Sequence, residues 1–511
     1  MALFESVLTL LLLAILLLQV SRRLSIPYPT MLAIAGLGVA ALPWAPAISI
    51  EPHLVMALFI APAILEAAYD FPPRAIRRYW IPLFALAVVA VLLTTAAVAW
   101  VGITVAGLPI AAAVALGAIV APPDAAAAAA MLDRPSLPRS TVTVLKGESL
   151  LNDAVALLIF GIALHINATG KEVYEVLPRI AFAIPGGILL GIVTSHIALR
   201  AVPYLAGTLG GILFQFVLTF GIWIIAEWLD VSAILAVVAA AMTVSRRANT
   251  QSARDRLHSN AVWSVVVFML NVLAFLFVGL QARTIVLALD GPQFRHAMGF
   301  ALLVLATVVV VRIVWVMVYG RVAQLIYRRI GYGKGPTIKQ GIVASWCGMR
   351  GMITLAAALA LPESFPQRDL ILLSALTVVI GTLVVQGITL EPLIRLLRFP
   401  PDSSRDQELA RARSELAKVA EAALEGRDDE AARSLRSELD SELDLDADAR
   451  HKAIGPADRL RLESIRAQRE ALHRMRSEGS IEDEAFQMLE QELDLSEVAA
   501  ARREPFALVD T

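Results

Sequence analysis

Residues 146–160 carry two carboxylates, an amide and a hydroxyl within an otherwise apolar stretch of membrane-spanning character. An ionisable side chain at mid-bilayer costs about 2.5 to 3.5 kcal/mol, so two of them this close together call for a functional reason. One face of a helix here would carry Glu148, Ser149, Asn152 and Asp153. The last two offer neighbouring oxygen atoms to one hard cation, and only the aspartate can also carry a proton. The spacing predicts a site for a hard cation, in which Asp153 is the group that could also take up a proton.

A third acidic residue, Asp124, follows Pro122 and Pro123 in the middle of the apolar segment 111–131. Because proline has no N–H group, carbonyls one turn earlier lose their donors and the helix should break. Asp124 would then begin the second half-helix, where free N–H groups favour an anion and freed carbonyls can face a cation. Irregular backbone at membrane depth is tolerated only where protein buries it or it lines a cavity, so the segment predicts part of a site.

Another apolar segment, residues 345–355, contains Gly348, Arg350 and Gly351. The two glycines weaken a helix at mid-depth, and the buried arginine requires a carboxylate partner. This interrupted span is seven spans after the one that holds Asp124, so the two should run in opposite directions. Two interrupted helices in inverted topology are typical of transporters built from inverted repeats, with the site where the helices cross.

The elements that position these residues follow from composition. Of the 511 residues, 58% are hydrophobic and 17% are charged, and the mean hydropathy is +0.69, which excludes an ordinary soluble domain. About thirteen apolar runs, each near the roughly 20 residues that a membrane helix needs, lie before residue 400. Alternate loops hold about 17 and about five Lys and Arg residues, which predicts an outside N-terminus. The sequence predicts an all-α polytopic membrane protein.

Two domains are expected. Residues 1–400 would form the transmembrane domain, and residues 401–511, rich in Glu, Arg, Ala and Leu at helical spacing, would form a water-soluble helical tail on the cytoplasmic side. Breaks are expected at Gly455-Pro456 and Gly479-Ser480. The charges of the tail alternate in sign, which favours exposed helices over nucleic-acid binding. A regulatory role, a dimer contact and a plain solvated appendage all remain open for it.

Two further charged residues lie inside apolar spans. Glu66 belongs to the third span, and we interpret it as a member of the site or its close neighbour, with a structural hydrogen bond as the alternative. Arg312 lies well inside the eleventh span, and the sequence does not identify its partner. A structural ion pair or a lipid contact is the expected role of Arg312, ahead of transport chemistry.

Three motifs in this order resemble one family. They are Val-Ala-Pro-Pro-Asp-Ala at residues 120–125, Gly-Glu-Ser-Leu-Leu-Asn-Asp at residues 147–153 and Gly-Met-Arg-Gly at residues 348–351. They resemble the monovalent cation:proton antiporter-1 family of NhaP-type and animal NHE-type Na+/H+ exchangers, as does Leu-Glu-Ala at residues 65–67. The resemblance covers roughly residues 1–400. It implies an NhaA-like antiporter fold, with inverted repeats and two crossing discontinuous helices.

The resemblance also implies roles for individual residues. Asp153 looks like the carboxylate that carries the transported ion or proton, with Asn152 beside it, and Asp124 like the aspartate of the unwound helix. Ser149 is similar to a cation-coordinating hydroxyl, and Glu66 to the third-helix glutamate near the site. Asp153, Asp124 and Ser149 would hold the transported Na+.

Two features of these motifs refine the expectation. Glu148 resembles the structural carboxylate of the family, paired with the arginine that matches Arg350. Many members have Thr-Asp-Pro where this chain has Pro123-Asp124-Ala125, so that hydroxyl is missing here. The Asn-Asp pair resembles members that exchange one cation for one proton without net charge movement.

The predicted function is therefore secondary active exchange of Na+, with Li+ or K+ also open, for H+ by alternating access. This is not an enzyme, needs no cofactor, and would serve pH homeostasis as a homodimer in the lipid of a bacterial plasma membrane. A K+-selective K+/H+ antiporter is the alternative within this class. A cation channel and an intramembrane aspartyl protease are remote alternatives, because no repeated carbonyl filter and no Gly-x-Gly-Asp motif occurs in the chain.

Overall fold

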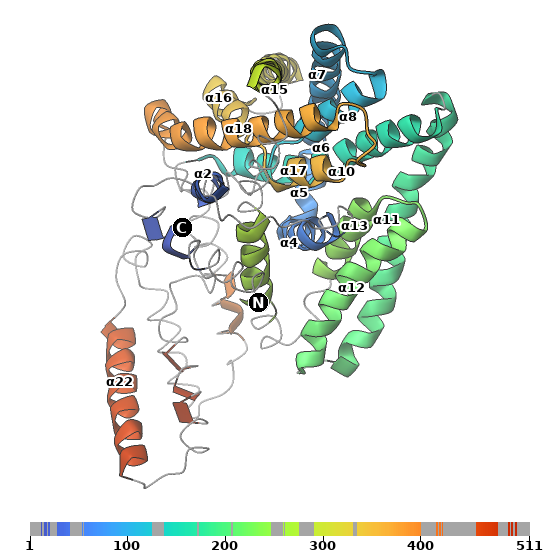
Figure 1. Ribbon diagram of the computed structural model, residues 1–511. Helices are drawn as coiled ribbons and strands as arrows, with labels where there is room; N and C mark the ends of the chain where they lie inside the picture. Colours follow the sequence, from blue (N-terminus) through green and yellow to red (C-terminus); the bar gives the residue numbers. More distant parts are fainter. Residues whose placement is uncertain are drawn as a thin grey trace. The chain divides into compact units, whose positions relative to one another are not determined.

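The computed structural model describes two units of the chain, residues 1–401 with the last two residues, and residues 402–509. The described residues are 28–40, 56–124, 137–170, 173–205, 208–246, 261–274, 291–330, 335–399 and 456–478, with isolated positions at 12–20, 54, 259, 415–422 and 489–497. Every element in these ranges is a helix (Figure 1).

The first unit holds six helices that are long and apolar enough to cross a membrane among the residues described. They comprise the continuous run of α6 (Trp80–Phe84), η2 (Ala85–Val89) and α7 (Ala90–Ala106), then α10 (Arg139–Thr169), α11 (Val173–Leu205), α12 (Leu209–Trp228), α15 (Gly291–Ile330) and α18 (Arg368–Leu397). The first predicted span and the second half of the fifth lie mostly outside the described residues.

Shorter helices complete this unit. They are α2 (Tyr28–Ala40), η1 (Met56–Ile60), α4 (Ala61–Asp70), α5 (Pro73–Arg78), α8 (Ile110–Val120), α13 (Ala233–Ser245), an apolar helix at Ala261–Ala274, α16 (Ile338–Trp346) and α17 (Met352–Leu359). Among them α8, α16 and α17 are too short to span a bilayer, which needs about 20 residues. Each is predicted to be one half of an interrupted span. The predicted break at the two glycines is confirmed between Trp346 and Met352, and α8 ends at Val120, just before the two prolines. The second half predicted for the α8 span lies outside the described residues.

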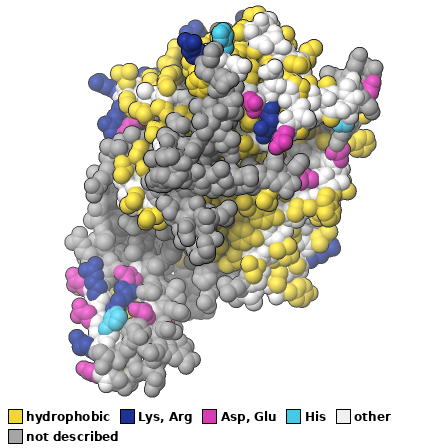
Figure 2. All heavy atoms as spheres, in the orientation of Figure 1, with side chains coloured by type: hydrophobic (Ala, Val, Ile, Leu, Met, Phe, Trp, Pro, Cys, Tyr) yellow, Lys and Arg dark blue, Asp and Glu magenta, His cyan; other side chains and the backbone are white. Residues whose placement is uncertain are grey.

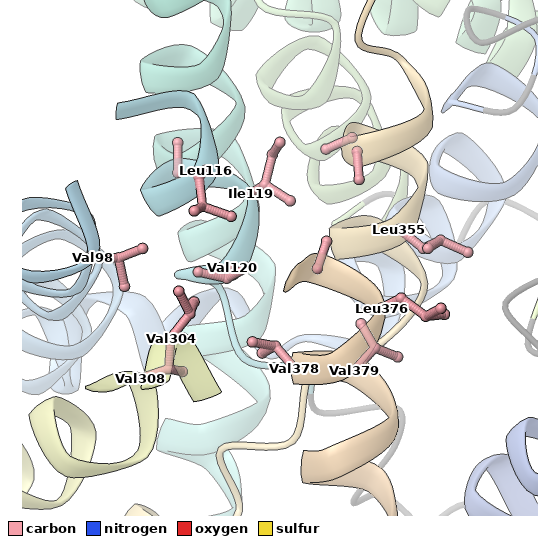
Figure 3. Close-up of a cluster of buried hydrophobic side chains, with 14 of the residues drawn as sticks. Val98, Leu116, Ile119, Val120, Val304, Val308, Leu355, Leu376, Val378 and Val379 are labelled. Atoms are coloured by element: carbon pink, nitrogen blue, oxygen red, sulfur yellow. The ribbon is translucent and has the colours of Figure 1, made fainter. Parts of the chain in front are cut away.

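The core is centred on α8, whose Leu116, Ile119 and Val120 are almost fully buried. Figure 3 shows these side chains beside apolar residues of α7, α15, α17 and α18. Small residues allow this close packing: a Cβ at Gly117 would contact the backbone carbonyl of Thr95 on α7. A half-helix in this position is enclosed by protein, which is the condition under which broken backbone survives at membrane depth.

The outer face of the first unit carries many exposed hydrophobic side chains, such as Trp100 (68% exposed), Ile110 (72%) and Leu213 (65%). Figure 2 shows such side chains covering much of the visible part of this face. Water would penalise so much exposed apolar surface, whereas lipid tails accommodate it. Of the second unit, α22 (Pro456–Ser477) is described, and it occupies the stretch between the two breaks predicted for the tail.

Candidate functional site

Helix α10 presents the central residues of the predicted site. Asn152 is fully buried and Asp153 is 6% exposed, while Ser149, one turn earlier, is half-buried. The helix packs against α8, α4 and α13, so its polar face looks into protein. Glu66 lies on α4, half-buried, on a helix in contact with α10. The predicted ligands on α10 therefore share a protein-facing side of one span.

The interrupted α8 meets α10 at its break. The chain leaves the helix at Ala121 and continues without helical hydrogen bonds to Asp124. The Asn152 side-chain amide donates to the Pro123 carbonyl oxygen at 2.9 Å. Asp153 is the next residue on α10, and the negative charge of Asp124 acts on it through a repulsive electrostatic interaction. The structure thus brings together the three residues that the sequence placed at the centre of the site.

The second interrupted span meets the first at the same break. The backbone N–H of Asp124 donates to the Met349 carbonyl oxygen at 2.7 Å, joining the gap after α8 to the gap between α16 and α17. In a continuous helix that N–H would bond to the Val120 carbonyl, four residues earlier. Its use across the two spans frees the Val120 carbonyl for another donor.

Arg350 supplies that donor. Its Nε donates to the Val120 carbonyl at 3.1 Å and its Nη2 to the Ala121 carbonyl at 3.2 Å, while Nη1 bonds to the Gly348 carbonyl. Its own backbone N–H donates to Thr382 Oγ1 on α18 at 3.0 Å. The planar guanidinium, with five donors in a fixed geometry, is well suited to gather several carbonyl oxygens. Arg350 therefore donates to the Val120 carbonyl in place of its helical donor, and it also binds the carbonyls of Ala121 and Gly348.

The predicted pairing of Glu148 with Arg350 is wrong. Glu148 (1% exposed) pairs with Arg312 (3% exposed) of α15 through two hydrogen bonds, Nη1 to Oε1 at 2.6 Å and Nη2 to Oε2 at 3.2 Å. Arg312 also donates from Nη2 to the Ala344 carbonyl of α16 at 2.9 Å. The guanidinium donors of Arg350 already bind backbone carbonyls, so the Glu148 carboxylate pairs with Arg312 instead. The sequence placed Arg312 at membrane depth but did not identify this partner, although a buried arginine must have one.

The two glycines of the Gly-Met-Arg-Gly motif leave room for side chains from other spans. A Cβ at Gly351 would collide with the carboxylate of Asp124, and one at Gly348 would collide with the Arg312 side chain. Neither glycine has a positive φ. The close approach of these side chains requires glycine at both positions.

The arrangement combines two acidic side chains with an amide oxygen. Asn152 Oδ1 is buried and has no hydrogen-bond partner in the described part of the chain, although its Nδ2 is bonded. A buried acceptor left without a donor costs about 1–3 kcal/mol, a penalty that a cation ligand would relieve. Carboxylate and amide oxygens are the ligands that hard cations prefer. A buried carboxyl group can also be neutralised by a proton.

Comparisons with known proteins agree with this arrangement. Residues 7–396 match the family model described as sodium/hydrogen exchanger, transmembrane. An uncharacterized Na+/H+ exchanger of Mycobacterium tuberculosis is 29% identical over 506 residues, covering 93% of this chain and 92% of that protein. A sodium, potassium, lithium and rubidium/H+ antiporter of Bacillus subtilis is 27% identical, covering 93% of this chain and 75% of that protein.

The fold is also similar to a solved structure. The sodium proton antiporter MjNhaP1 from Methanocaldococcus jannaschii matches with a TM-score of 0.60 and 16% identity, over 78% of this chain and all of that one. Together with the family match, this makes the chain an integral membrane transporter rather than an enzyme. The chain belongs to the Na+/H+ exchanger family, in its NhaP-like cation:proton antiporter-1 branch, and is a monovalent cation/H+ antiporter.

Proposed function

We propose that Asp153 is the carboxylate for which the cation and the proton compete, and that one cation is exchanged for one proton. The observation that carries this proposal is the burial of Asp153 at the break of α8, within electrostatic range of Asp124. A bare carboxylate in a low-dielectric interior is costly, so the site moves across the membrane readily only when a proton or a cation neutralises it. That requirement couples the two fluxes and forbids a leak of either ion alone.

The remaining predicted ligands complete the cation shell in this proposal. Asp124, Ser149 and Glu66 would contribute oxygen atoms with Asp153, and the unpartnered Oδ1 of Asn152 would face the same cation. Asn152 also has a structural role, because its Nδ2 donates a hydrogen bond to the Pro123 carbonyl in the break after α8. With a neutral amide at this position, one positive charge enters for each positive charge that leaves.

Alternating access would use the whole transmembrane unit. We propose about thirteen spans in inverted repeats, with the interrupted spans crossing at the site, an outside N-terminus and a cytoplasmic tail. The direct hydrogen bond from Asp124 to the Met349 carbonyl supports the crossing. We also propose that the protein works as a homodimer in a bacterial plasma membrane.

Na+ is the cation we propose. Li+ and K+ are further candidates, because the Bacillus relative is named as a sodium, potassium, lithium and rubidium/H+ antiporter. A K+-selective antiporter is the second candidate. Reconstituted vesicles loaded with a pH dye should be offered Na+, Li+ and K+ in turn. Flux that saturates with cation concentration identifies a carrier, whereas current that rises in proportion to voltage would indicate a channel.

The test of Asp153 uses the variant Asp153→Asn in the same vesicles. We expect cation-driven proton flux to fall to the level of empty vesicles, because the amide keeps the shape of the side chain but neither titrates nor carries charge. Asp230→Asn is the matched control: Asp230 is exposed, lies at the turn between α12 and α13, and has a left-handed backbone that asparagine tolerates. Exchange that persists in Asp153→Asn would refute the assignment.

A further inference from the structure

A cavity of about 440 Å³ lies between α15, α16 and α18, and the proposed transport cycle does not use it. These helices contact one another pairwise and lie together in Figure 1. Its walls include Met317 of α15, Ile342 and Trp346 of α16, and Thr389, Leu393 and Leu396 of α18. We call this cavity the α15–α18 groove. Leu396 is 77% exposed, so the groove reaches the outer surface of the unit.

The few polar atoms of the α15–α18 groove are already bonded. Trp346 Nε1 donates to Thr389 Oγ1 at 2.8 Å, and that hydroxyl donates to the Val385 carbonyl. Ser345 donates to the Gly341 carbonyl at 2.8 Å. The groove therefore presents hydrocarbon surface with satisfied polar groups. In a membrane-spanning unit such a surface suits an acyl chain better than a polar ligand.

Two exposed basic residues continue the faces that line the groove. Arg321 follows Met317 by four positions on α15, and Lys339 precedes Ile342 by three positions on α16. Side chains three or four positions apart on a helix are neighbours on one face. Each basic group therefore lies one turn beyond the apolar lining of its own helix.

Both basic residues lie at the same end of the groove. Gln324 of α15 donates to the Pro336 carbonyl at 2.5 Å, and Arg312 donates to the Ala344 carbonyl, so α15 and α16 are antiparallel with Arg321 level with the start of α16. Lys339 is the second residue of α16.

Helix α18 reaches that end too. The bonds from Trp346 to Thr389 and from Arg350 to Thr382 show that α18 runs antiparallel to the α16–α17 pair. Lys339, seven residues before Trp346, is then level with Leu396, seven residues after Thr389. Arg395 is nearby in sequence, but its charge is compensated by Glu391 at 2.5 Å. Arg398, two residues after Leu396, also lies at this end, whereas Arg321 and Lys339 lie one turn beyond the groove lining on α15 and α16.

We propose that the α15–α18 groove binds an anionic phospholipid, with an acyl chain in the cavity and the phosphate between Arg321 and Lys339. Basic side chains beside a groove between membrane helices attract anionic headgroups, and charge complementarity favours such a lipid over a zwitterionic one. Two lining residues lie next to residues that support the site: Ile313 follows Arg312, and Trp346 is the last residue before the interruption. A bound lipid would hold together α15, which carries Arg312, α16, which is the first half of the interrupted span, and α18.

Trp346 offers a direct test with the full chain in bilayers of phosphatidylcholine and phosphatidylglycerol. Lipids with brominated acyl chains quench nearby tryptophan, and the difference between wild type and Trp346→Phe isolates Trp346 from the other seven tryptophans. We expect brominated phosphatidylglycerol to quench Trp346 with a binding preference over brominated phosphatidylcholine of about fivefold for each basic side chain. Equal quenching by the two lipids would overturn the proposal.

The double variant Arg321→Gln/Lys339→Gln should lose this preference. Its control is Arg200→Gln/Arg246→Gln, which removes two exposed positive charges from the ends of α11 and α13 and should keep the preference. A preference that survives in the first variant, or that is lost equally in both, would contradict the site. Inorganic phosphate should not displace the lipid, and displacement would point to a free-anion site instead. If Trp346→Phe does not fold, phosphatidylglycerol retention by the wild type and the two double variants in native mass spectrometry decides the question.

Discussion

At the scale of single residues, the chemistry depends on which buried charges are compensated. Glu148 and Arg312 neutralise each other, and the two hydrogen bonds fix their geometry. Arg350 keeps its positive charge among backbone carbonyls. Asp153 is buried, and the negative charge of Asp124 acts on it, an arrangement that favours binding of a positive ion. Glu148 of the ion pair and Asp153 of the proposed site thus lie on the same helix, α10.

The ion pair gives a stability prediction. We expect Glu148→Ala and Arg312→Ala each to destabilise the protein by about 3–5 kcal/mol, because each leaves an unpaired buried charge. The double variant should lose less than the sum of the two. The measurement is a double-mutant cycle from denaturation midpoints in detergent. A larger coupling of Glu148 to Arg350 than to Arg312 would contradict the pairing seen here.

A second residue-scale prediction concerns the amide at the break of α8. Asn152→Ala should cost about 1–3 kcal/mol, because the buried carbonyl of Pro123 loses its donor. The control is Asn167→Ala, an exposed position on the same helix, which should change stability by less than about 0.5 kcal/mol. Both variants can be compared by thermal unfolding. Equal stability of the two would show that Asn152 does not support the break.

At the scale of elements, each of the two interrupted spans supplies hydrogen-bond partners for backbone groups of the other. The gap after α8 receives donors from Arg350 and Asn152, and gives one N–H to the Met349 carbonyl in the other gap. Each break would leave unbonded backbone groups if it stood alone, at a cost of several kcal/mol per group in lipid. The α8 break and the α16–α17 break are therefore interdependent. The Met349 carbonyl in the second break binds the backbone N–H of Asp124 in the first and so fixes the position of Asp124.

Gly351 tests this interdependence. Gly351→Ala should sharply reduce exchange, because the added Cβ would collide with the Asp124 carboxylate and push it from its place. Gly161→Ala is the matched control, since a Cβ there meets nothing within 4 Å on α10. Replacing that helical glycine should leave transport intact and raise stability by up to about 1 kcal/mol. Vesicle flux and thermal unfolding report the two effects separately, and full transport by Gly351→Ala would argue against a site role for the close contact.

At the scale of the whole molecule, the site lies entirely within the first unit. All the residues that we assign to ion exchange precede Pro401, and the second unit begins at Asp402. If about thirteen spans precede that boundary, as we propose, the second unit would lie on the side opposite the N-terminus, and the loop charges predict that this side is the cytoplasm.

A topology reporter checks this arrangement. A fluorescent protein that folds only in the cytoplasm, fused after Thr511, should be bright, while the same fusion at the N-terminus should be dark. A periplasmic reporter enzyme should give the reverse pattern at both ends. A dark C-terminal fusion with an active periplasmic reporter would mean that the span count is wrong by one.

Sequence alone determined where the helices break. Proline without an N–H group and glycine without a side chain act on their own backbone, so Pro122, Pro123, Gly348 and Gly351 mark the interruptions without reference to the rest of the chain. Composition similarly determined that the protein lies in a membrane. The positions of Asn152 and Asp153 determined that one face of their helix is polar.

Only the tertiary structure decided which buried charges meet. Arg312, Arg350 and Glu148 all lie inside apolar spans, and the sequence alone does not tell which of the two arginines reaches Glu148. That choice depends on the carbonyl groups at the α8 break. They accept the hydrogen bonds of the Arg350 guanidinium, and Glu148 therefore pairs with Arg312. The α15–α18 groove likewise depends on the tertiary structure, because its lining runs from Ile313 to Leu396, 83 positions apart in the sequence, and forms only when these helices pack.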